Sequence, residues 1–350
     1  MAYSDSSYRR QIDTKLEDDL KLKKAELPAF CKTFFNSTDT SISIRTKISY
    51  AMDMRVFFKW VIQSNPAYSK YEIKDLPFEC IENLTSLDID EYMMWLSNYD
   101  DEGIKYRNDL KAKKRKLSTL RSFFRFYVEK NFLKFNPAAD VRNVKLEKTL
   151  PTVLDEDEVK AFLSIIEYGS GLTDKALEYH EKTKTRDLAI FTILLNTGIR
   201  ISELVGLNLN DFDFDKGEFR VIRKGNKEDI IPYNEAVEDI LFYYLDYDRG
   251  NFTEDDEEQA LFLSLQKKRI TVKAVENLCK KYSEIAVPLK KITPHKLRST
   301  FGTKIYNDTG DIYLTADLLG HSSVDTTKRY YASINTQRKR DAVRNFSYNN

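Results

Sequence analysis

The sequence predicts a mainly α-helical protein of two domains, with a small β-hairpin or sheet in the second domain (α+β). A chain of 350 residues is long enough for two separate cores. Apolar residues recur at three- and four-residue steps through most of the chain, which is typical of helices. We expect a helical domain over residues 1–140, a Pro-punctuated basic linker over 141–153, and a second domain over 154–350.

Residues 1–140 are expected to form helices only. An amphipathic pattern from Ile44 to Val61 predicts a helix of about five turns that ends before Pro66. Asp88, with Glu91 three residues later, marks the start of a second helix. A third helix is predicted from about residue 108 to residue 130, with one apolar and one strongly basic side.

The second domain begins with a helix start. Asp155 and Glu158 have the spacing of a capping box. The polar residues 168–184 are expected to form an irregular excursion. Residues 186–196 contain a largely apolar run, which predicts a buried helix that ends at Gly198.

The periodicity changes between Glu218 and Tyr233. β-branched and aromatic residues flank Lys224-Gly225-Asn226-Lys227, and a Gly-Asn turn in this setting indicates a β-hairpin. Helical patterns then return at about residues 234–247, 271–285, 294–307, 312–319 and 324–332.

The net charge of +1 hides a local excess of positive charge. Residues 105–148 hold 14 Lys and Arg against 4 Asp and Glu. Such a stretch is either a solvated helix face or a surface that binds nucleic acid, and charge alone leaves both open. No apolar run could span a membrane and no signal peptide is visible, so we expect a cytoplasmic protein without a membrane partner. The three cysteines are far apart, which argues against a zinc ribbon.

Five short motifs carry candidate chemistry. Each is an ordinary feature taken alone: an Arg after a buried helix, a Lys on a turn, a His-x-x-Arg pair, a Gly-His after a helix and a Tyr-Tyr pair. In chain order they are Arg200 in TGIRISEL, Lys224 in RKGNK, His295 and Arg298 in TPHKLRSTF, His321 in LLGHSS and Tyr330 in TTKRYY.

In this order and spacing the motifs resemble those of the tyrosine recombinases, site-specific DNA recombinases and integrases, across essentially the whole chain. The family closes on DNA as a two-domain, C-shaped clamp. The segment before Arg186 and the sequence Arg223-Lys224-Gly225 are similar to the single-protein Xer recombinases of streptococci and lactococci. The resemblance implies DNA recombination, with chromosome dimer resolution, and hence chromosome partition and cell division, as the role. Integration, excision or inversion by a mobile element, a type IB topoisomerase and an inactive DNA-binding protein are the alternatives.

The resemblance implies a role for each motif residue. Arg200 and Arg298 clamp the non-bridging phosphate oxygens with planar charged groups. Tyr330 is the nucleophile, and a base must take its proton because only about one phenol in a thousand is ionised at pH 7. The remaining assignments are His295 as general base, Lys224 as general acid, His321 as a hydrogen-bond donor to the phosphate and Glu203 as a supporting residue.

Two of these assignments have rivals nearby. Tyr331 adjoins Tyr330, but the two side chains of a helix point about 100° apart, and the nine-residue step from His321 favours Tyr330. Lys227 shares the predicted turn with Lys224, which directly precedes the turn glycine as the family's lysine does.

The resemblance also implies double-stranded DNA with a specific site as the partner. Protein copies bind single sites as monomers or dimers and form a homotetramer when two sites pair, with the tail after Tyr331 docking on a neighbouring subunit. No cofactor and no metal are expected, because the sequence has no P-loop, no HExxH and no carboxylate cluster of metal-site type. The predicted phosphate contacts in the first domain are Lys47, Arg55, Lys113, Lys114, Arg115, Lys116 and Arg121.

Overall fold

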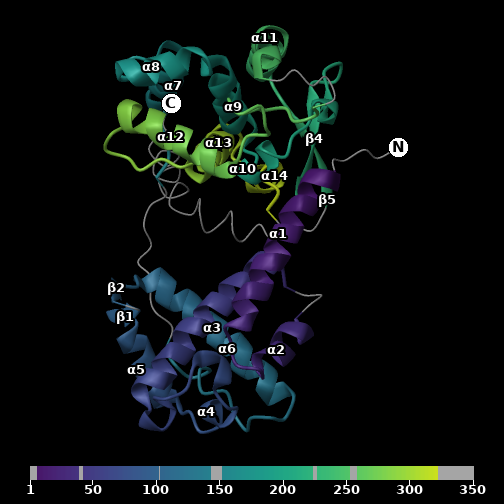
Figure 1. Cartoon of the computed structure of the whole chain (residues 1–350). Helices are drawn as coiled ribbons and strands as arrows, with labels where there is room; N and C mark the ends of the chain where they lie inside the picture. The colour runs from purple at the N-terminus through teal and green to yellow at the C-terminus, as the bar shows by residue number, and fades with distance from the viewer. Residues whose placement is uncertain are drawn as a thin grey trace, which may run out of the picture. The chain divides into compact units, whose positions relative to one another are not determined.

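The computed structural model describes residues 6–38, 42–101, 103–142, 152–223, 227–252 and 258–321. The chain divides into two compact units, Met1–Lys148 and Thr149–Asn350. Each unit has its own apolar core, and helices make up most of both (Figure 1). The predicted fold class, mainly helical with small antiparallel sheets, is confirmed.

Unit 1 is built from six helices among its described residues, and α3 and α6 supply much of its core. α3 begins at Ile44 as predicted, because the Ser43 side chain accepts a hydrogen bond from the Thr46 N–H. The helices are α1 (Ser6–Ala25), α2 (Cys31–Ser37), α3 (Ile44–Ser64), α4 (Glu79–Glu82), α5 (Ser86–Trp95) and α6 (Leu110–Glu129), with 3-10 turns η1 (Pro66–Tyr68) and η2 (Ile73–Asp75).

Two predictions for unit 1 are wrong. Helix α5 begins earlier than expected, because Thr85 and Asp88 form its capping box and Asp88 is the third residue of the helix rather than its cap. The unit is also not purely helical. Strands β1 (Tyr99–Asp101) and β2 (Ile104–Tyr106) form an antiparallel hairpin, in which Gly103 adopts a left-handed backbone and donates to the Asp100 carboxylate.

Unit 2 packs around helix α9, which contacts α7, α11 and α13. The capping box of Asp155 and Glu158 is present at the start of α7. The helices are α7 (Glu156–Tyr168), α8 (Asp174–Glu181), α9 (Lys184–Thr197), α10 (Ile201–Leu204), α11 (Glu235–Tyr243), α12 (Val272–Ala286), α13 (Pro294–Thr309) and α14 (Ile312–Leu318), with 3-10 turns η3 (Leu209–Asp211) and η5 (Arg249–Phe252) and a short π-helix η4 (Tyr244–Asp248).

The expected irregular excursion over residues 168–184 is wrong for its second half. Residues 174–181 form α8, because Thr173 caps the helix through the Ala176 N–H. The buried side of α8 carries His180, which approaches the Tyr282 hydroxyl. The segment is polar in sequence but contributes to the packing of unit 2.

The predicted hairpin of unit 2 is confirmed. Strand β4 (Glu218–Arg223) pairs antiparallel with β5 (Lys227–Pro232), from Glu218 opposite Pro232 to Arg223 opposite Lys227. The two-residue strand β3 (Phe212–Asp213) extends the sheet on the other side of β4. The hairpin therefore brings Arg223, the last residue of β4, to the end of the sheet where the chain turns.

Several predicted features lie outside the described residues. They are most of the linker (143–151), Lys224 with the turn 224–226, and residues 322–350 with the predicted helix 324–332, Tyr330, Tyr331 and the tail. In the part of the chain that the structure describes, no helix has the length and apolar character needed to cross a membrane.

Candidate active site

The site begins at the C-terminal end of α9. Gly198 ends this helix with a left-handed backbone (φ 61°), and a Cβ atom at this position would overlap the ring of Phe301 on α13. Glycine is therefore required both by the backbone conformation and by the close approach of α13. The chain then buries Ile199 and presents Arg200 at the start of α10.

Glu203 holds Arg200 through two hydrogen bonds. One carboxylate oxygen accepts from the Arg200 backbone N–H at 2.7 Å, and the other accepts from Nη1 at 2.8 Å. The Glu203 side chain is only 4% exposed, whereas that of Arg200 is 36% exposed. A buried carboxylate thus orients a guanidinium group that still reaches solvent.

Helix α13 supplies the next two predicted residues. It begins at Pro294 after Thr293, so His295 lies in its first turn and Arg298 one turn later. Arg298 is buried, and its Nη1 donates to the Gly198 carbonyl at 2.5 Å. The packing of α13 against α9 therefore fixes this guanidinium beside the segment that carries Arg200.

The C-terminal end of α14 binds three arginines. Gly320 (φ 56°) and His321 close the helix with N–H groups that donate to Asp317 and Ala316 at 2.7 and 2.9 Å. The carbonyl groups of Leu318, Leu319 and Gly320 lie at the end of the helix and must accept hydrogen bonds from outside it. One arginine donates to each of these carbonyls. Arg223 Nη2 donates to Leu318 at 3.1 Å, Arg298 Nη2 donates to Leu319, and Arg200 Nη2 donates to Gly320 at 3.1 Å.

These carbonyls lie at the negative end of a helix, which favours cations. The same holds for the Gly198 carbonyl at the end of α9. Two helix ends thus hold guanidinium groups from three different elements close together, although their charges repel. Arg200, whose side chain is 36% exposed, presents its guanidinium to solvent, where it can meet an anion such as a phosphate.

Both histidines of the site have lowered pKa values. Desolvation and the charges of Arg298 and Arg200 lower the pKa of His321 to about 4, with smaller effects from His295 and Arg223. Desolvation and the charges of Arg298, Lys296 and Arg200 lower the pKa of His295. Both rings are therefore neutral at pH 7, so each has one N–H that can donate a hydrogen bond and one nitrogen that can accept one.

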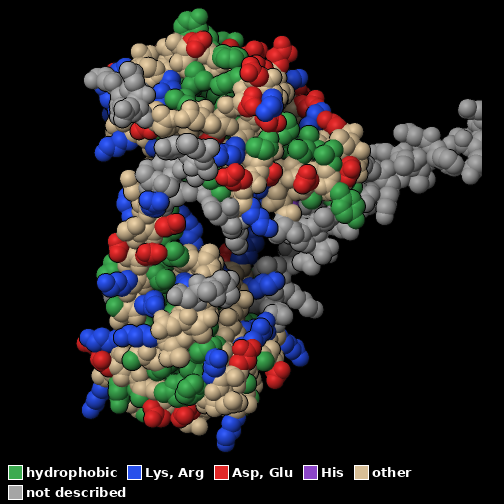
Figure 2. Space-filling model, turned by 90° about the vertical axis from the view of Figure 1, so that its right-hand side faces the viewer, with side chains coloured by type: hydrophobic (Ala, Val, Ile, Leu, Met, Phe, Trp, Pro, Cys, Tyr) green, Lys and Arg blue, Asp and Glu red, His purple; other side chains and the backbone are tan. Residues whose placement is uncertain are grey.

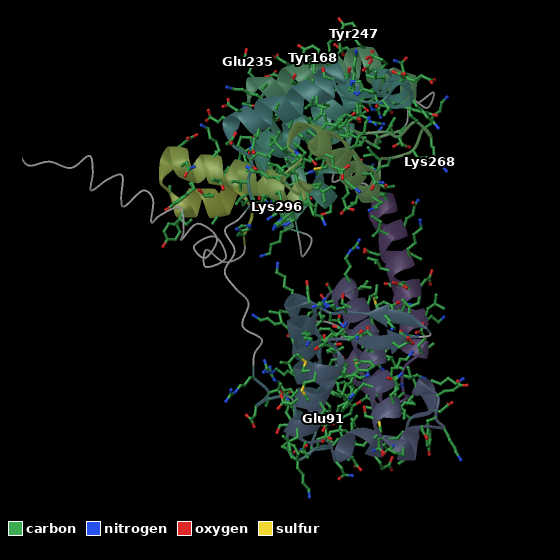
Figure 3. All side chains as sticks on the ribbon, turned by 90° about the vertical axis from the view of Figure 1, so that its left-hand side faces the viewer. Glu91, Tyr168, Glu235, Tyr247, Lys268 and Lys296 are labelled. Carbon is green, nitrogen blue, oxygen red and sulfur yellow. The ribbon has the colours of Figure 1, made fainter. Side chains whose placement is uncertain are left out.

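The described site brings together five of the predicted residues: Arg200, Glu203, His295, Arg298 and His321. Lys296, between the two predicted residues of α13, projects from the surface of unit 2 (Figure 3). The predicted Lys224 and Tyr330 lie outside the described residues. Sequence reasoning did not assign Arg223 to the site, and the signal for it was its position directly before Lys224.

Two of the predicted phosphate contacts in unit 1 need correction. Lys116 is 6% exposed and pairs at 3.1 Å with Asp53, which also accepts from Arg115 (2.6 Å) and Thr119 (2.9 Å). The expectation that Lys116 faces water or a polyanion is wrong, because a buried carboxylate on α3 draws it into the core. Lys47 is likewise buried, at 4% exposed, which argues against a phosphate contact.

The remaining predicted contacts of unit 1 are partly or fully exposed. Lys114 is exposed, Arg115 has a half-exposed side chain, and Lys113 donates to Ser97 at 2.6 Å. Arg55 pairs with Glu26 and Asp101, and Arg121 donates to the carbonyls of Ala138 and Val141. Figure 2 shows Lys and Arg side chains on the visible face of unit 1, with Asp and Glu among them.

Comparisons with known sequences agree with the geometry. The sequence pattern of the phage integrase family matches residues 152–338. The tyrosine recombinase XerC of Caldanaerobacter subterraneus subsp. tengcongensis is 32% identical over 333 residues, which cover 92% of this chain and 88% of that protein. The tyrosine recombinase XerS of Lactococcus lactis subsp. cremoris strain MG1363 is 28% identical over 354 residues, which cover 95% and 98%.

Solved structures share the fold. The recombinase XerH bound to a palindromic difH substrate, in a post-cleavage complex, has a TM-score of 0.65 at 19% identity and covers 94% of each chain. A lambda integrase dimer bound to a core site has a TM-score of 0.59 at 18% identity, over 84% of this chain and 93% of that one. At these identities the likeness concerns the fold alone.

A helical unit with a small sheet and a cluster of arginines and histidines at two helix ends has the chemistry of a site that binds a phosphate group. The sequence relationships then make the class specific: the chain belongs to the phage integrase family, as a tyrosine recombinase of Xer type. The resemblance read from the motifs is confirmed, and so is the prediction of a site-specific DNA recombinase.

Proposed function

We propose that the protein cleaves and rejoins double-stranded DNA at a specific recombination site, with Tyr330 as the nucleophile. The observation that carries the proposal is the convergence of Arg200, Arg298 and His321 at the end of α14. These groups suit a phosphodiester whose non-bridging oxygens gain negative charge during attack. In the sequence, Tyr330 follows His321 by nine residues.

The proposed step is a transesterification. The Tyr330 oxygen forms a bond to phosphorus while the bond from phosphorus to the 5′ oxygen breaks. His295 takes the tyrosine proton, and Lys224 gives a proton to the leaving 5′ oxygen. The products are a 3′-phosphotyrosyl link and a free 5′-hydroxyl, and the 5′-hydroxyl of a partner strand reverses the step.

The pKa of His295 supports its assignment as the base. Because the pKa of this ring is lowered, it is neutral at pH 7 and has a nitrogen that can accept the tyrosine proton. The pKa of His321 supports a different role, because a ring that stays neutral down to about pH 4 is a poor proton acceptor and serves as a hydrogen-bond donor. Arg200 and Arg298 then compensate the charge of the phosphorane.

We further propose that the biological role is the resolution of chromosome dimers in the cytoplasm. The relatives named XerC and XerS extend along at least 92% of this chain, so the relationship includes both units. In this role two recombination sites pair within a homotetramer and exchange strands through a Holliday junction. A mobile-element integrase shares the same chemistry, and an assay on chromosome dimers separates the two.

A nicked suicide substrate tests the chemistry. When the short fragment that carries the 5′-hydroxyl diffuses away, the protein stays attached to the 3′ end and migrates as a covalent adduct in a denaturing gel. We expect an adduct whose protein part maps to Tyr330 by mass spectrometry. DNA binding without any adduct would leave only an architectural DNA-binding protein and would overturn the proposal. Relaxation of supercoiled DNA without site preference would favour the topoisomerase alternative.

A further inference from the structure

Arg223 is the third arginine at the end of α14, and the proposed chemistry does not use it. It is the last residue of β4 and lies opposite Lys227, the first residue of β5. Its side chain is 9% exposed. A buried guanidinium at the tip of a two-stranded hairpin needs a specific reason, because a charged group at such a position is ordinarily solvated.

The contacts of Arg223 join the hairpin to the turn that carries His321. Nη2 donates to the Leu318 carbonyl at 3.1 Å, and Nε donates to the carboxylate of Asp229 on β5. The guanidinium also lies directly against Gly320, where an added Cβ atom would overlap it. The left-handed glycine before His321 thus leaves the space that the Arg223 side chain fills.

This arrangement places the backbone of Arg223 at a fixed position relative to the phosphate-binding groups. Three consecutive carbonyls, of residues 318–320, accept hydrogen bonds from Arg223, Arg298 and Arg200 in that order. One short segment therefore aligns all three arginines. Lys224 is bonded to Arg223, and consecutive Cα atoms are about 3.8 Å apart. The anchored residue Arg223 is therefore the immediate chain neighbour of Lys224, the proposed general acid.

We infer that Arg223 is a positioning residue that ties the Lys224 end of the hairpin to the His321 turn, so that the proton donor and the phosphate-binding groups stay in register. The inference rests on the proposed function, in which Lys224 protonates the leaving 5′ oxygen. A misplacement of about 1 Å can cost on the order of 100-fold in rate. In this role Arg223 acts through Lys224, and its burial keeps the guanidinium away from solvent.

A sulfur leaving group separates this role from a structural one. A 5′-thiolate leaves without protonation, so a suicide substrate with sulfur in place of the bridging 5′ oxygen does not need the general acid. The measured quantity is the rate of adduct formation with enzyme in excess. It is determined for the parent chain, Arg223→Ala and Lys224→Ala on the ordinary suicide substrate (the oxygen substrate) and on the one with bridging sulfur (the sulfur substrate). Arg220→Ala is the matched control, because Arg220 lies on the same strand but pairs with Asp211 and Glu228.

We expect Arg223→Ala to lose on the order of 100-fold on the oxygen substrate and to come within about threefold of the parent chain on the sulfur substrate. Lys224→Ala shows the same rescue, and Arg220→Ala loses little on either substrate. Arg223→Lys keeps the charge but not the planar fork, so it too is impaired on oxygen and rescued by sulfur. If Arg223→Ala does not fold, judged by its thermal melting, Arg223→Lys provides the same comparison.

Equal losses on both substrates would mean that Arg223 acts on the phosphate or on the fold, and no loss on either would mean that it does not act at all. Either outcome overturns the inference, provided that Lys224→Ala is rescued by sulfur. If Lys224→Ala is not rescued, the assignment of Lys224 as the acid has failed, and the inference fails with it. Adduct formation by Tyr330→Phe would overturn the proposed function itself.

Discussion

The buried guanidinium of Arg298 is bonded to the carbonyl of Gly198, 2.5 Å from its Nη1, two residues before Arg200 in the chain. The same side chain also reaches the Leu319 carbonyl at the end of α14. One arginine therefore connects the C-terminal ends of two helices, and its position is set by backbone atoms that no substitution of a side chain removes. The site is built around this link.

Replacing Arg298 by lysine tests the geometry of this link. Lysine keeps the positive charge but cannot donate from a planar fork to two carbonyls and a phosphate at once. We expect the rate of adduct formation to fall roughly 10²- to 10³-fold, as when one preorganised donor to a transition-state oxygen is removed. Arg220→Lys on β4 is the control. Adduct formation at the parental rate by Arg298→Lys would contradict the role of Arg298 as a clamp.

Glu203 is expected to act through Arg200. The change Glu203→Gln keeps a carbonyl that can accept from the Arg200 N–H but removes the charge that pairs with Nη1. The lost charge-assisted bond predicts a roughly tenfold slower cleavage with unchanged DNA affinity. Single-turnover rates and a gel-shift titration measure the two quantities. A change in affinity alone would place Glu203 outside the catalytic arrangement.

The pKa of His321 predicts how stability depends on pH. The folded protein keeps this ring neutral down to about pH 4, whereas the unfolded chain takes up the proton near the ordinary value of 6.5. Because the unfolded state then binds more protons, the free energy of unfolding falls as pH decreases from about 6.5 to about 4. Above about pH 6.5 the ring is neutral in both states, and no stability is lost through its titration.

Denaturant unfolding at pH 5 and at pH 7.5 measures this difference. His321→Asn removes the titrating ring, so the loss of stability between the two pH values should be smaller than in the parent chain. His180 is also buried with a lowered pKa and contributes to the parental slope. An unchanged difference in His321→Asn would show that His321 titrates normally.

The basic side of α6 gives a prediction about salt. Neutralising Lys113 and Lys114 with glutamine should weaken binding to all DNA sequences and lower the slope of log K against log salt by up to about 2, one unit for each phosphate contact. Lys116→Gln should instead leave the slope unchanged. It should destabilise unit 1 by about 2 kcal/mol, because Asp53 then loses one charged partner while it keeps Arg115 and Thr119. A lower salt slope in Lys116→Gln, without any loss of stability, would contradict the burial of Lys116.

Local signals explain why much of the fold could be predicted from the sequence. The capping box at Asp155 and the hairpin around Gly225 depend on residues a few positions apart, and both elements begin or end where the sequence indicates. The hairpin β1–β2 was missed because each strand has three residues. Helix α8 was missed because its composition is polar and its cap, Thr173, follows two turn glycines.

The enzyme class was predictable from the order of the motifs, but the geometry of the site was not. The acceptors that hold Arg200, Arg298 and Arg223 are backbone carbonyls, which have no signature in the sequence. Lys116 shows the same limit in unit 1. Its basic neighbours suggest an exposed face, whereas its partner Asp53 lies 63 residues away in the sequence and is identified only in the folded structure.

The identity of the nucleophile is the central claim, and a comparison of two adjacent tyrosines tests it most directly. Tyr330→Phe and Tyr331→Phe are each incubated with the nicked suicide substrate, and covalent adducts are counted on a denaturing gel beside a DNA-binding control. The account predicts no adduct for Tyr330→Phe and parental adduct formation for Tyr331→Phe, with both variants binding DNA. Adduct formation by Tyr330→Phe at the parental rate would contradict it.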